Sequence, residues 1–516
     1  MSAGIPITLL LVAGLLLAAG EVHSADVWIE HSAVKVLRDA VPTERKSADL
    51  CAARREWESF QIALKSEKPI ADVHVEASAL KQVGGKGVIP AKDVALSLVA
   101  YVPIKDPPVP YPDPLPPIRE FDLKPNEAQP IWVTVKVPAD CAAGDYEGTI
   151  KVSGDGLAKK VPVCLHVWSF ALPVTPRCVT AFGVSMEYVA RAHGVTGDTA
   201  KTLDLSKKYY EILLQHRISP YHMPVDLTSP EAKAYLEDPR MTSYMIPYLD
   251  NDAKQKALFD HLITNDWFKK GYFYPIDEPV NKDSYDRMAA IAKRLRSIEP
   301  RYRLVVPFFR GPDFDESKTI WDLAMGQVNI WCPNEHYLDL QARTRNFLRM
   351  RRNAGDDVWW YVCCGPYEPY ANFFVEYPAM RHRMLFWHQK REDVDGLLYW
   401  STTYWNPDLG VADPWKNMRT VPQINPNIYG DGSLLYPGKP VGVDGPVASQ
   451  RLAVIRDGIE DFDYLCLAEE AIGRDATMGY IRRIAKDLQD YTIDPWAMEK
   501  VRRELGEVIQ AADGRR

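Results

Sequence analysis

Alternating hydrophobic and polar positions characterise the first third of the chain. Between about residues 26 and 172, apolar and polar side chains alternate in short runs such as 60–64, 73–77 and 132–137, with turn residues between the runs. A repeat of two residues is that of a β-strand with one buried face. The pattern therefore predicts an antiparallel β-sandwich domain over residues 25–173.

A proline-rich segment interrupts this pattern at residues 107–117. Proline has no backbone N–H to contribute to a central strand, and it favours turns. We expect this segment to be an exposed loop, long enough to cover a neighbouring cleft.

The periodicity changes after the segment 172–176. Eight short apolar or aromatic runs follow, and helix-period segments separate most of them, for example where Leu205, Tyr209 and Leu213 share one helix face. The runs lie at 179–184, 218–221, 243–248, 271–276, 303–308, 328–332, 357–362 and 396–400. Eight strands that alternate with helices are typical of a (β/α)8 TIM barrel, which we predict for residues 177–470.

The last part of the chain, from about residue 446, has the spacing of helices. We expect the closing helix of the barrel there, followed by a C-terminal helical tail over residues 471–516. The charged cluster 456–461 lies on this closing helix. Charges on an amphipathic helix usually form a solvated face or structural ion pairs, so we do not assign this cluster to catalysis.

The first 24 residues predict a signal peptide. An apolar run from Ile5 to Ala19 precedes a polar stretch that ends at Ser24, with small residues where a signal peptidase cleaves. The run is short for a membrane span, although the absence of Lys or Arg before it leaves an uncleaved anchor as the alternative. We expect cleavage after Ser24, export to the periplasm or the extracellular space, and no membrane span in the mature chain.

The composition narrows the possible partners. The 516 residues are 46% hydrophobic and 25% charged, and the net charge of −7 is spread without long runs of one sign. This is the composition of a globular protein, and it gives no electrostatic basis for binding nucleic acid or an anionic membrane. A neutral substrate such as a carbohydrate fits it better, and the oligomeric state stays open.

Cysteine, metal and cofactor motifs add little. Eight cysteines in a chain of this length do not make a disulfide scaffold, and we expect most of them to be buried thiols. A vicinal disulfide between Cys363 and Cys364 is the less favoured alternative to a strand end. No metal-ligand spacing, nucleophile elbow, phosphate loop or dinucleotide fingerprint is present in the sequence. We therefore predict no metal and no cofactor, and neither a serine hydrolase nor a nucleotide-binding protein.

Two adjacent acids follow the fourth run of the predicted barrel. The stretch 271–276 is mostly apolar and aromatic, and Asp277, Glu278 and Pro279 come directly after it. Active sites of such barrels lie at the C-terminal ends of the strands, and glycoside hydrolysis needs a proton donor and a stabilising negative charge. Asp277 and Glu278 are therefore the candidate catalytic residues. The alternative is that Asp277 caps the next helix and Glu278 is solvated.

Aromatic and hydrogen-bonding residues collect at the ends of the other predicted strands. Flat aromatic rings stack on the apolar face of a sugar, and amide, imidazole and phenol groups suit its hydroxyls. The candidate substrate-binding residues are His222, Trp331, Asn334, Tyr337, Tyr361, Asn372, Trp400 and Trp405. Taken singly, these aromatics are more typical of core packing and these asparagines of turns, so the prediction depends on their gathering at one end of the barrel.

Six motifs, in one order along the chain, resemble glycoside hydrolase family 123. They are 55–61, 144–148, 277–279, 398–400, 430–438 and 456–461. Each motif is weak alone, but the ordered set covers nearly the whole mature chain. The resemblance implies an N-terminal β-sandwich, a (β/α)8 catalytic domain and a retaining β-N-acetylgalactosaminidase activity.

The resemblance also implies a mechanism, in which the 2-acetamido group of the substrate is the nucleophile. Asp277 would orient and polarise that group, and Glu278 would act first as general acid and then as general base. Tyr361 or Tyr337 would donate a hydrogen bond to the acetamido oxygen. The expected function is removal of terminal β-linked N-acetylhexosamine, above all N-acetylgalactosamine, from glycans.

Two other functions stay open at this point. A conventional glycosidase would pair Glu278 with a distant nucleophile, Glu187 or Glu335, and would hydrolyse sugars with and without the 2-acetamido group equally well. A non-catalytic glycan-binding protein with a degenerate barrel would bind sugars without turnover, although the intact Asp277–Glu278 pair argues against it.

Overall fold

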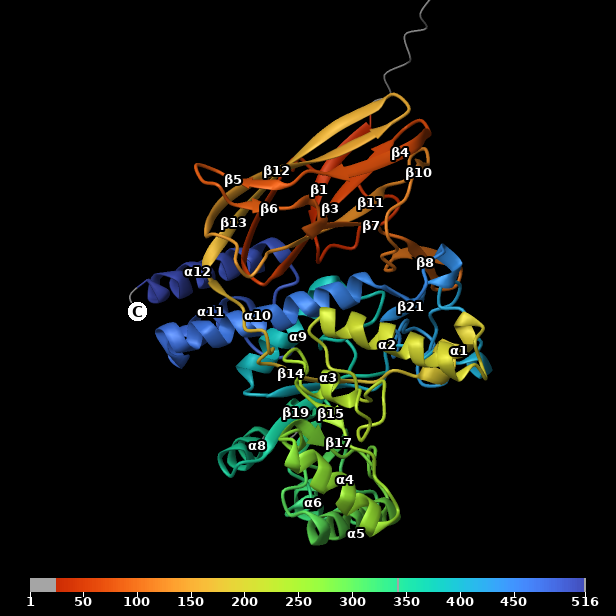
Figure 1. Cartoon of the computed structure of the whole chain (residues 1–516), viewed down its shortest axis with the longest axis vertical. Coiled ribbons are helices and arrows are strands. Elements are labelled where there is room, and N and C mark those ends of the chain that lie inside the picture. Colours follow the sequence, from red (N-terminus) through yellow and green to blue (C-terminus); the bar gives the residue numbers. More distant parts are fainter. Residues whose placement is uncertain (1–24, 341–342, 515–516) are drawn as a thin grey trace, which may run out of the picture.

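A computed structural model of the chain describes residues 25–340 and 343–514, which form a β-rich N-terminal part stacked on a larger α/β part with a helical C-terminal region (Figure 1). The predicted signal peptide, residues 1–24, lies outside the described residues, so cleavage and export stay predictions. No helix within the described ranges is both long and apolar enough to cross a membrane.

The N-terminal part contains the two sheets that the alternating pattern predicts. One has the order β1-β3-β11-β7. The other has the order β10-β4-β12-β13-β2, in which β5 also pairs with β12, and β6 pairs with β5. The strands are β1 Ala25–His31, β2 Ala48–Arg54, β3 Trp57–Ser66, β4 Ile70–Ala77, β5 Leu80–Gln82, β6 Val88–Ile89, β7 Val94–Leu98, β10 Phe121–Leu123, β11 Gln129–Lys136, β12 Gly144–Gly154 and β13 Leu157–Ala171. The inward residues of both sheets, such as Ile62, Val133 and Leu165, are fully buried in one core. One pair departs from the antiparallel prediction: β2 runs parallel to β13, because the chain crosses from one sheet to the other between β1 and β2.

The proline-rich segment is not the exposed loop that the sequence predicts. It belongs to a hairpin of β8 (Tyr101–Ile104) and β9 (Val109–Pro112), which is exposed only around its turn. The residues after β9 are buried, because the carboxylate of Asp113 pairs with Arg451 at 2.8 Å and accepts a hydrogen bond from the Tyr436 hydroxyl at 2.6 Å. The segment therefore docks the sandwich on the C-terminal part of the chain.

The second part is built on parallel strands. A five-stranded sheet has the order β14-β20-β19-β18-β17, and β15 pairs with β16 in a separate two-stranded sheet. These strands are β14 Val179–Phe182, β15 Tyr244–Met245, β16 Gly271–Tyr272, β17 Val305–Phe308, β18 Ile330–Pro333, β19 Asp357–Tyr361 and β20 Gly396–Tyr399. Single bridges join Phe182 to Pro220 and Phe273 to Leu304. Each of the eight predicted runs thus contains a strand or a bridge, but several runs pair over only one or two residues.

Helices follow most of these strands, as the helix-period segments predict. They are α1 Met186–His193, α2 Thr199–Gln215, α3 Ala232–Leu236, α4 Asp252–Thr264, α5 Lys282–Ile298, α6 Ile320–Ala324, α7 Tyr337–Leu340, α8 Arg343–Asn353 and α9 Ala379–Arg391. The side chains of Asp198, Asn251 and Asn281 accept a backbone N–H in the first turns of α2, α4 and α5, which is why these three helices begin where they do. A short hairpin of β21 (Leu435–Pro437) and β22 (Pro446–Ala448) precedes the C-terminal helices.

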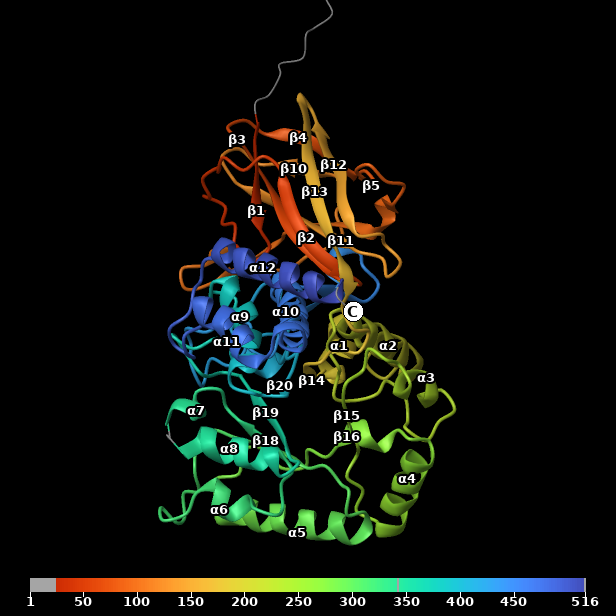
Figure 2. The ribbon, with the colours of Figure 1, turned by 90° about the vertical axis from the view of Figure 1, so that its left-hand side faces the viewer.

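The C-terminal region is helical, as the sequence predicts, and its helices join the two parts. They are α10 Gln450–Ile472, α11 Arg474–Ile484 and α12 Pro495–Asp513, and α12 lies along the underside of the sandwich (Figure 2). One hydrophobic cluster includes Trp132 and Trp168 of the sandwich together with Trp387 of α9 and Leu505 of α12. Gly506 permits this packing, because a Cβ atom there would lie 2.4 Å from the Trp168 ring.

A buried network of ion pairs accompanies this cluster. Asp461 of α10 accepts hydrogen bonds from Arg383 of α9 at 2.7 and 2.9 Å and from Arg502 of α12 at 2.8 Å. Arg502 also pairs with Glu56 and Glu58 at the start of β3. The charged cluster 456–461 is therefore a set of structural ion pairs in the interior, which was one of the two interpretations of the sequence.

Candidate active site

Asp277 and Glu278 lie in the connection that follows β16. Tyr272 ends the strand, and the chain reaches the two acids five residues later. Glu278 has a φ of +42°, in the left-handed region that residues with a side chain rarely adopt. Such conformations cost about 1–3 kcal/mol, and they cluster at functional sites. The strain at Glu278 is therefore a second reason, independent of the motif, to examine this connection for catalysis.

Two tyrosines orient the two carboxyl groups. Tyr361, the last residue of β19, donates a hydrogen bond to Oε1 of Glu278. Tyr274 donates one to Oδ1 of Asp277 at 2.7 Å. Tyr274 belongs to the same segment as the two acids, whereas Tyr361 comes from β19, which is far from that segment in sequence. Each carboxyl group is thus held by its own phenol.

The surroundings of Glu278 favour its protonated form. Burial raises the pKa of Glu278 above its ordinary value, and the nearby negative charge of Asp277 adds to the rise, while the hydrogen bond from Tyr361 opposes it. Burial likewise raises the pKa of the Tyr361 phenol, so this residue remains a donor. A carboxyl group in this environment is able to hold a proton and to release it to a bound substrate.

Packed aromatic rings lie beside the acids. Asp277 and His222 are exposed, yet desolvation by the surrounding atoms lowers the pKa of His222. The ring of Tyr221 meets the rings of His222 and Tyr274 edge-on, at centroid distances of 6.4 and 5.8 Å. These contacts place His222 beside Tyr221, which packs on Tyr274, the residue that donates to Asp277.

Tyr221, Tyr274 and Tyr361 belong to one interior cluster of side chains. Its residues come from all eight of the predicted runs, and they are Val179, Ala181, Tyr221, Met245, Tyr272, Tyr274, Val305, Ile330, Cys332, Trp359, Tyr361, Cys363 and Leu398. Residues two apart on one strand, such as Trp359 and Tyr361, share the interior because side chains alternate between the faces of a strand. Tyr361 and Tyr274 therefore rise from the packed interior toward the acids.

Trp400 is held rigidly just after β20. Its indole N–H donates to Oδ1 of Asp431 at 3.1 Å, and its ring meets that of Tyr404 edge-on at 4.6 Å. Gly432 has a φ of +69°, and a Cβ atom there would lie 2.2 Å from the Trp400 ring. Burial raises the pKa of Asp431 to about 7. Because β20 neighbours β19, a half-buried and fixed indole at this strand end is suited to stack on a sugar.

Three other predicted aromatic residues lie in the core and are closed off from solvent. Trp331 packs on Trp321 and Phe347 and donates to Asp356 at 2.7 Å. Tyr337 packs edge-on against Phe308 and Trp321. Trp405 packs on Tyr209 of α2 and donates to Ser433 at 3.0 Å. Each is at most 1% exposed, because these side chains fill the layer between the strands and the helices.

The two predicted asparagines brace loops. Asn372 is fully buried and donates to the carbonyl oxygens of Cys363 and Pro366, at 2.9 and 3.0 Å. Asn334 bridges to Tyr361 and donates to the carbonyl of Gly365 at 3.3 Å. Both amides thus hold the connection that follows Tyr361.

The carboxyl groups of the two alternative nucleophiles, Glu187 and Glu335, bind partners other than the candidate acids. Glu187 is exposed on α1, where it pairs with Arg191 one turn later. Glu335 is fully buried and lies 3.1 Å from Nδ1 of His388, on the side of α9. The residues that the sequence analysis missed are Tyr274 and Asp431, although Tyr274 lies in the same run as the acids and Asp431 lies in the 430–438 motif.

The cysteines are not paired in disulfides. All eight cysteines are free thiols, and the Sγ atoms of Cys363 and Cys364 lie 3.6 Å apart. Within residues 25–340 and 343–514, no group of three or more His, Cys, Asp or Glu side chains is placed to hold a metal ion. The candidate site thus consists of carboxyl, phenol, imidazole and indole groups.

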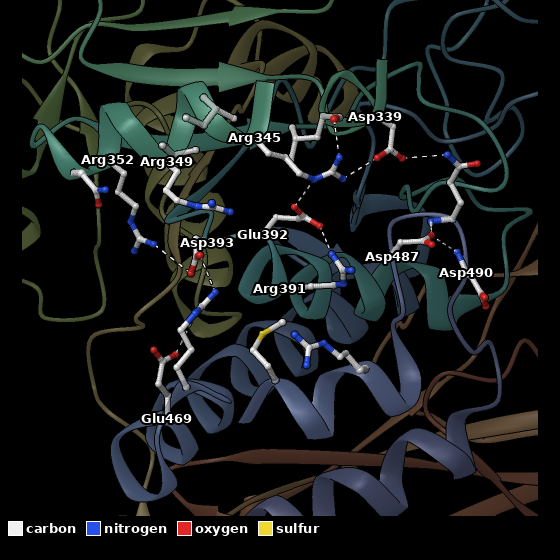
Figure 3. Close-up of a pocket in the computed structure, with 18 of the residues that line it drawn as sticks. Asp339, Arg345, Arg349, Arg352, Arg391, Glu392, Asp393, Glu469, Asp487 and Asp490 are labelled. Atoms are coloured by element: carbon white, nitrogen blue, oxygen red, sulfur yellow. Dashed lines mark hydrogen bonds and ion pairs between the residues drawn. The ribbon is translucent and has the colours of Figure 1, made fainter. Parts of the chain in front are cut away.

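A cavity of about 1420 Å³ lies elsewhere in this part of the molecule (Figure 3). Residues of α8, α11 and the end of α9 line it, and it includes neither acid nor the tyrosines that hold them. Its size alone therefore does not make it the catalytic site.

Two family models match this chain, one in each of its two parts. The model of the glycoside hydrolase 123 catalytic domain matches residues 211–468, and the model of the glycoside hydrolase 123 N-terminal domain matches residues 35–154. A comparison with curated proteins found no match.

Among solved structures, the chain is similar in fold to a family 123 glycoside hydrolase from Clostridium perfringens, studied for its hydrolysis of glycolipid glycans. The TM-score is 0.72 at 13% identity, and the match covers 95% of this chain and 98% of that chain. A GH2 β-galacturonidase from Eisenbergiella tayi matches with a TM-score of 0.32 at 13% identity, over 85% of this chain and 72% of that chain. A β-glucuronidase from Parabacteroides merdae matches with a TM-score of 0.27 at 9% identity, over 74% and 47% respectively.

Proposed function

The chain belongs to glycoside hydrolase family 123, and on that premise we propose that it removes terminal β-linked N-acetylhexosamine, above all N-acetylgalactosamine, from glycans. Membership of the family makes the protein a glycosidase, and the sugar and the mechanism are our proposal. The observation that carries the proposal is the adjacent Asp277–Glu278 pair, with each carboxyl group oriented by its own tyrosine.

The first step needs a protonated Glu278. The 2-acetamido oxygen of the substrate attacks the anomeric carbon, and the bond to the leaving group breaks as Glu278 gives its proton to the glycosidic oxygen. Asp277 accepts a hydrogen bond from the acetamido N–H, which increases the negative charge on the acetamido oxygen. The raised pKa of Glu278 supports this role.

The second step reverses the role of Glu278. Its carboxylate takes a proton from water, and that water attacks the anomeric carbon of the oxazoline-type intermediate, which restores the acetamido group and the β-configuration. Two adjacent acids suit this chemistry, because the nucleophile belongs to the substrate. A conventional retaining pair instead places its carboxyl groups on opposite faces of the sugar, about 5 Å apart.

We also propose that the eight strand segments form a closed (β/α)8 barrel over residues 177–470. The parallel order of the strands, the bridges at Phe182 and Phe273, and an interior cluster drawn from all eight runs support closure. The two acids then lie at the C-terminal end of the fourth strand, the usual place of an active site in this fold. Export of the chain after cleavage at Ser24 is part of the same proposal.

The substrate is tested with four aryl β-glycosides, those of N-acetylgalactosamine, N-acetylglucosamine, galactose and glucose. We expect hydrolysis of the acetamido sugars only, fastest for N-acetylgalactosamine, and loss of turnover in Asp277→Ala. Equal hydrolysis of all four would instead indicate a conventional glycosidase. Binding of glycans on an array without turnover of any of them would indicate a non-catalytic protein.

The hydrogen bond from Tyr361 sets the pH range of the reaction. Because this bond lowers the pKa of Glu278, Tyr361→Phe removes it and raises that pKa further. A general acid loses activity as the pH rises through its pKa, so the basic limb of the kcat/KM profile moves to higher pH in the variant. Profiles of both proteins on the aryl N-acetylgalactosaminide measure the shift.

The pH profile of Tyr361→Phe has a matched control. Tyr370→Phe is the matched variant, because this tyrosine donates to Asp339 at 3.1 Å and not to the acids. Its profile should coincide with that of the wild type. If the basic limb stays in place or moves to lower pH in Tyr361→Phe, Glu278 is not the general acid.

A further inference from the structure

The cavity between α8 and α11, here called the arginine groove, collects cationic side chains from several elements. Its arginines are Arg345, Arg349, Arg352, Arg391, Arg474 and Arg482. The first three lie at positions i, i+4 and i+7 of α8 and therefore share one helix face. Figure 3 shows that this face of α8 is turned toward the cavity, opposite α11.

Most of these arginines hold the walls of the groove. Arg345 bonds to both Asp339 and Glu392 at 2.7 Å, and Arg352 and Arg474 both pair with Asp393 (Figure 3). The remaining acids are also engaged: Lys390 pairs with Glu469, two backbone N–H groups donate to Asp487, and Lys486 pairs with Asp490. All six carboxylates of the lining are thus engaged, five by cationic side chains and Asp487 by backbone N–H groups.

Two guanidinium groups of the groove form no ion pair with the described residues. Arg349 and Arg482 line the cavity, and neither forms an ion pair with any residue that the structure describes. Arg349 projects from α8 into the space between the walls in Figure 3. A guanidinium offers a planar fork of N–H donors that matches carboxylate and sulfate groups. The groove therefore has unused donors for oxyanions, on a frame of paired arginines.

The rest of the lining suits a sugar chain. Leu348 and Met478 provide apolar wall, and Asn353 provides an amide for hydroxyl groups. The groove runs beside α8, whose 11 residues extend about 16 Å. One end is lined by Asp339 and Pro369, which follow β18 and β19 on the side of the candidate acids; the other end is lined by residues that precede β19 and β20.

We propose that the arginine groove binds the sulfate or carboxylate groups of an acidic glycan chain, outside the catalytic site. The choice of a glycan as ligand rests on the proposed function, whereas the anion site rests on the arginines alone. The groove would hold a chain whose end extends to the catalytic side of the barrel. Small neutral substrates would not need it.

The test compares ligands first. Isothermal titration of the wild type is carried out with a chondroitin sulfate hexasaccharide, with the desulfated hexasaccharide and with inorganic sulfate. We expect the sulfated hexasaccharide to bind, and we expect its affinity to fall as salt is added. Retained binding of the desulfated chain would assign the carboxylates as the recognised groups. Equal binding of inorganic sulfate, or no binding of either chain, would overturn the proposal.

The test then compares variants. Arg349→Gln with Arg482→Gln removes the two unpaired charges, and we expect binding at least tenfold weaker while hydrolysis of the aryl glycosides is unchanged. Arg287→Gln with Lys293→Gln removes two exposed charges of α5 and should bind as the wild type does. Equal binding by the wild type and the arginine variant, or equal weakening in both variants, would contradict the site. Because binding is measured without turnover, failure of the proposed hydrolysis leaves this result intact.

Discussion

Replacement of Glu278 by Gln is expected to lower kcat/KM on aryl N-acetylgalactosaminides by about 10²–10⁴-fold. The amide keeps the size of the side chain and a hydrogen-bonding group for Tyr361, but it has no proton to give to the leaving group. The loss should shrink as the leaving group becomes more acidic, because a good leaving group departs without protonation. Steady-state kinetics on aryl glycosides of graded leaving-group pKa measure both effects.

The matched control for this variant is Glu187→Gln. Glu187 is an exposed glutamate on α1, and it is one of the two candidates for the nucleophile of a conventional mechanism. We expect its kcat/KM to stay within twofold of the wild type. A Glu278→Gln variant that keeps more than a tenth of the activity, or an inactive Glu187→Gln, would contradict the assignment of Glu278.

Replacement of Asp461 by Ala is expected to lower the free energy of unfolding by about 3–5 kcal/mol. Asp461 is fully buried and accepts hydrogen bonds from Arg383, Arg502 and the Trp387 indole. Its removal leaves two buried guanidinium groups without this counter-ion. Urea denaturation followed by tryptophan fluorescence measures the change in midpoint.

Asp260→Ala is the matched control for the buried network. Asp260 pairs with Lys256 at 2.7 Å on the exposed face of α4. An exposed pair at this spacing contributes about 0.3–0.5 kcal/mol, so the midpoint should move little. Similar midpoints for Asp461→Ala and Asp260→Ala would mean that the buried network contributes no more than a surface pair.

The periodic features of the fold could be predicted from the sequence. Strand alternation and helix spacing record which faces are buried, and this is why the sandwich and the strand runs lie where the pattern predicts. The docking of the proline-rich hairpin could not be predicted, because it depends on a pairing of Asp113 with Arg451 across more than 330 residues. The same holds for α12, whose partner surface is on the sandwich.

The candidate site was predicted unevenly, for a reason of strand geometry. Neighbouring residues on a strand point to opposite faces. Cys332 of β18 faces the interior cluster and its neighbour Trp331 faces the helices, so a tryptophan at a strand end is not necessarily in a cleft. Along β19, counting in steps of two from Tyr361 tells which residues share its face. On the other strands the count has no starting point unless the register between the strands is known. The free arginines of α8 and α11 carried no motif at all.

The shared core of the sandwich and the C-terminal helices limits how this protein could be rearranged in evolution. Domain boundaries usually fall in exposed linkers that few contacts cross, so a domain can be joined or deleted there without exposing a core. Here, loss of the sandwich alone would expose the apolar face of α12 and leave Arg502 without Glu56 and Glu58. A descendant that discarded the sandwich would have to discard or rewrite α12 in the same step, so the two ends of the gene are expected to be inherited together.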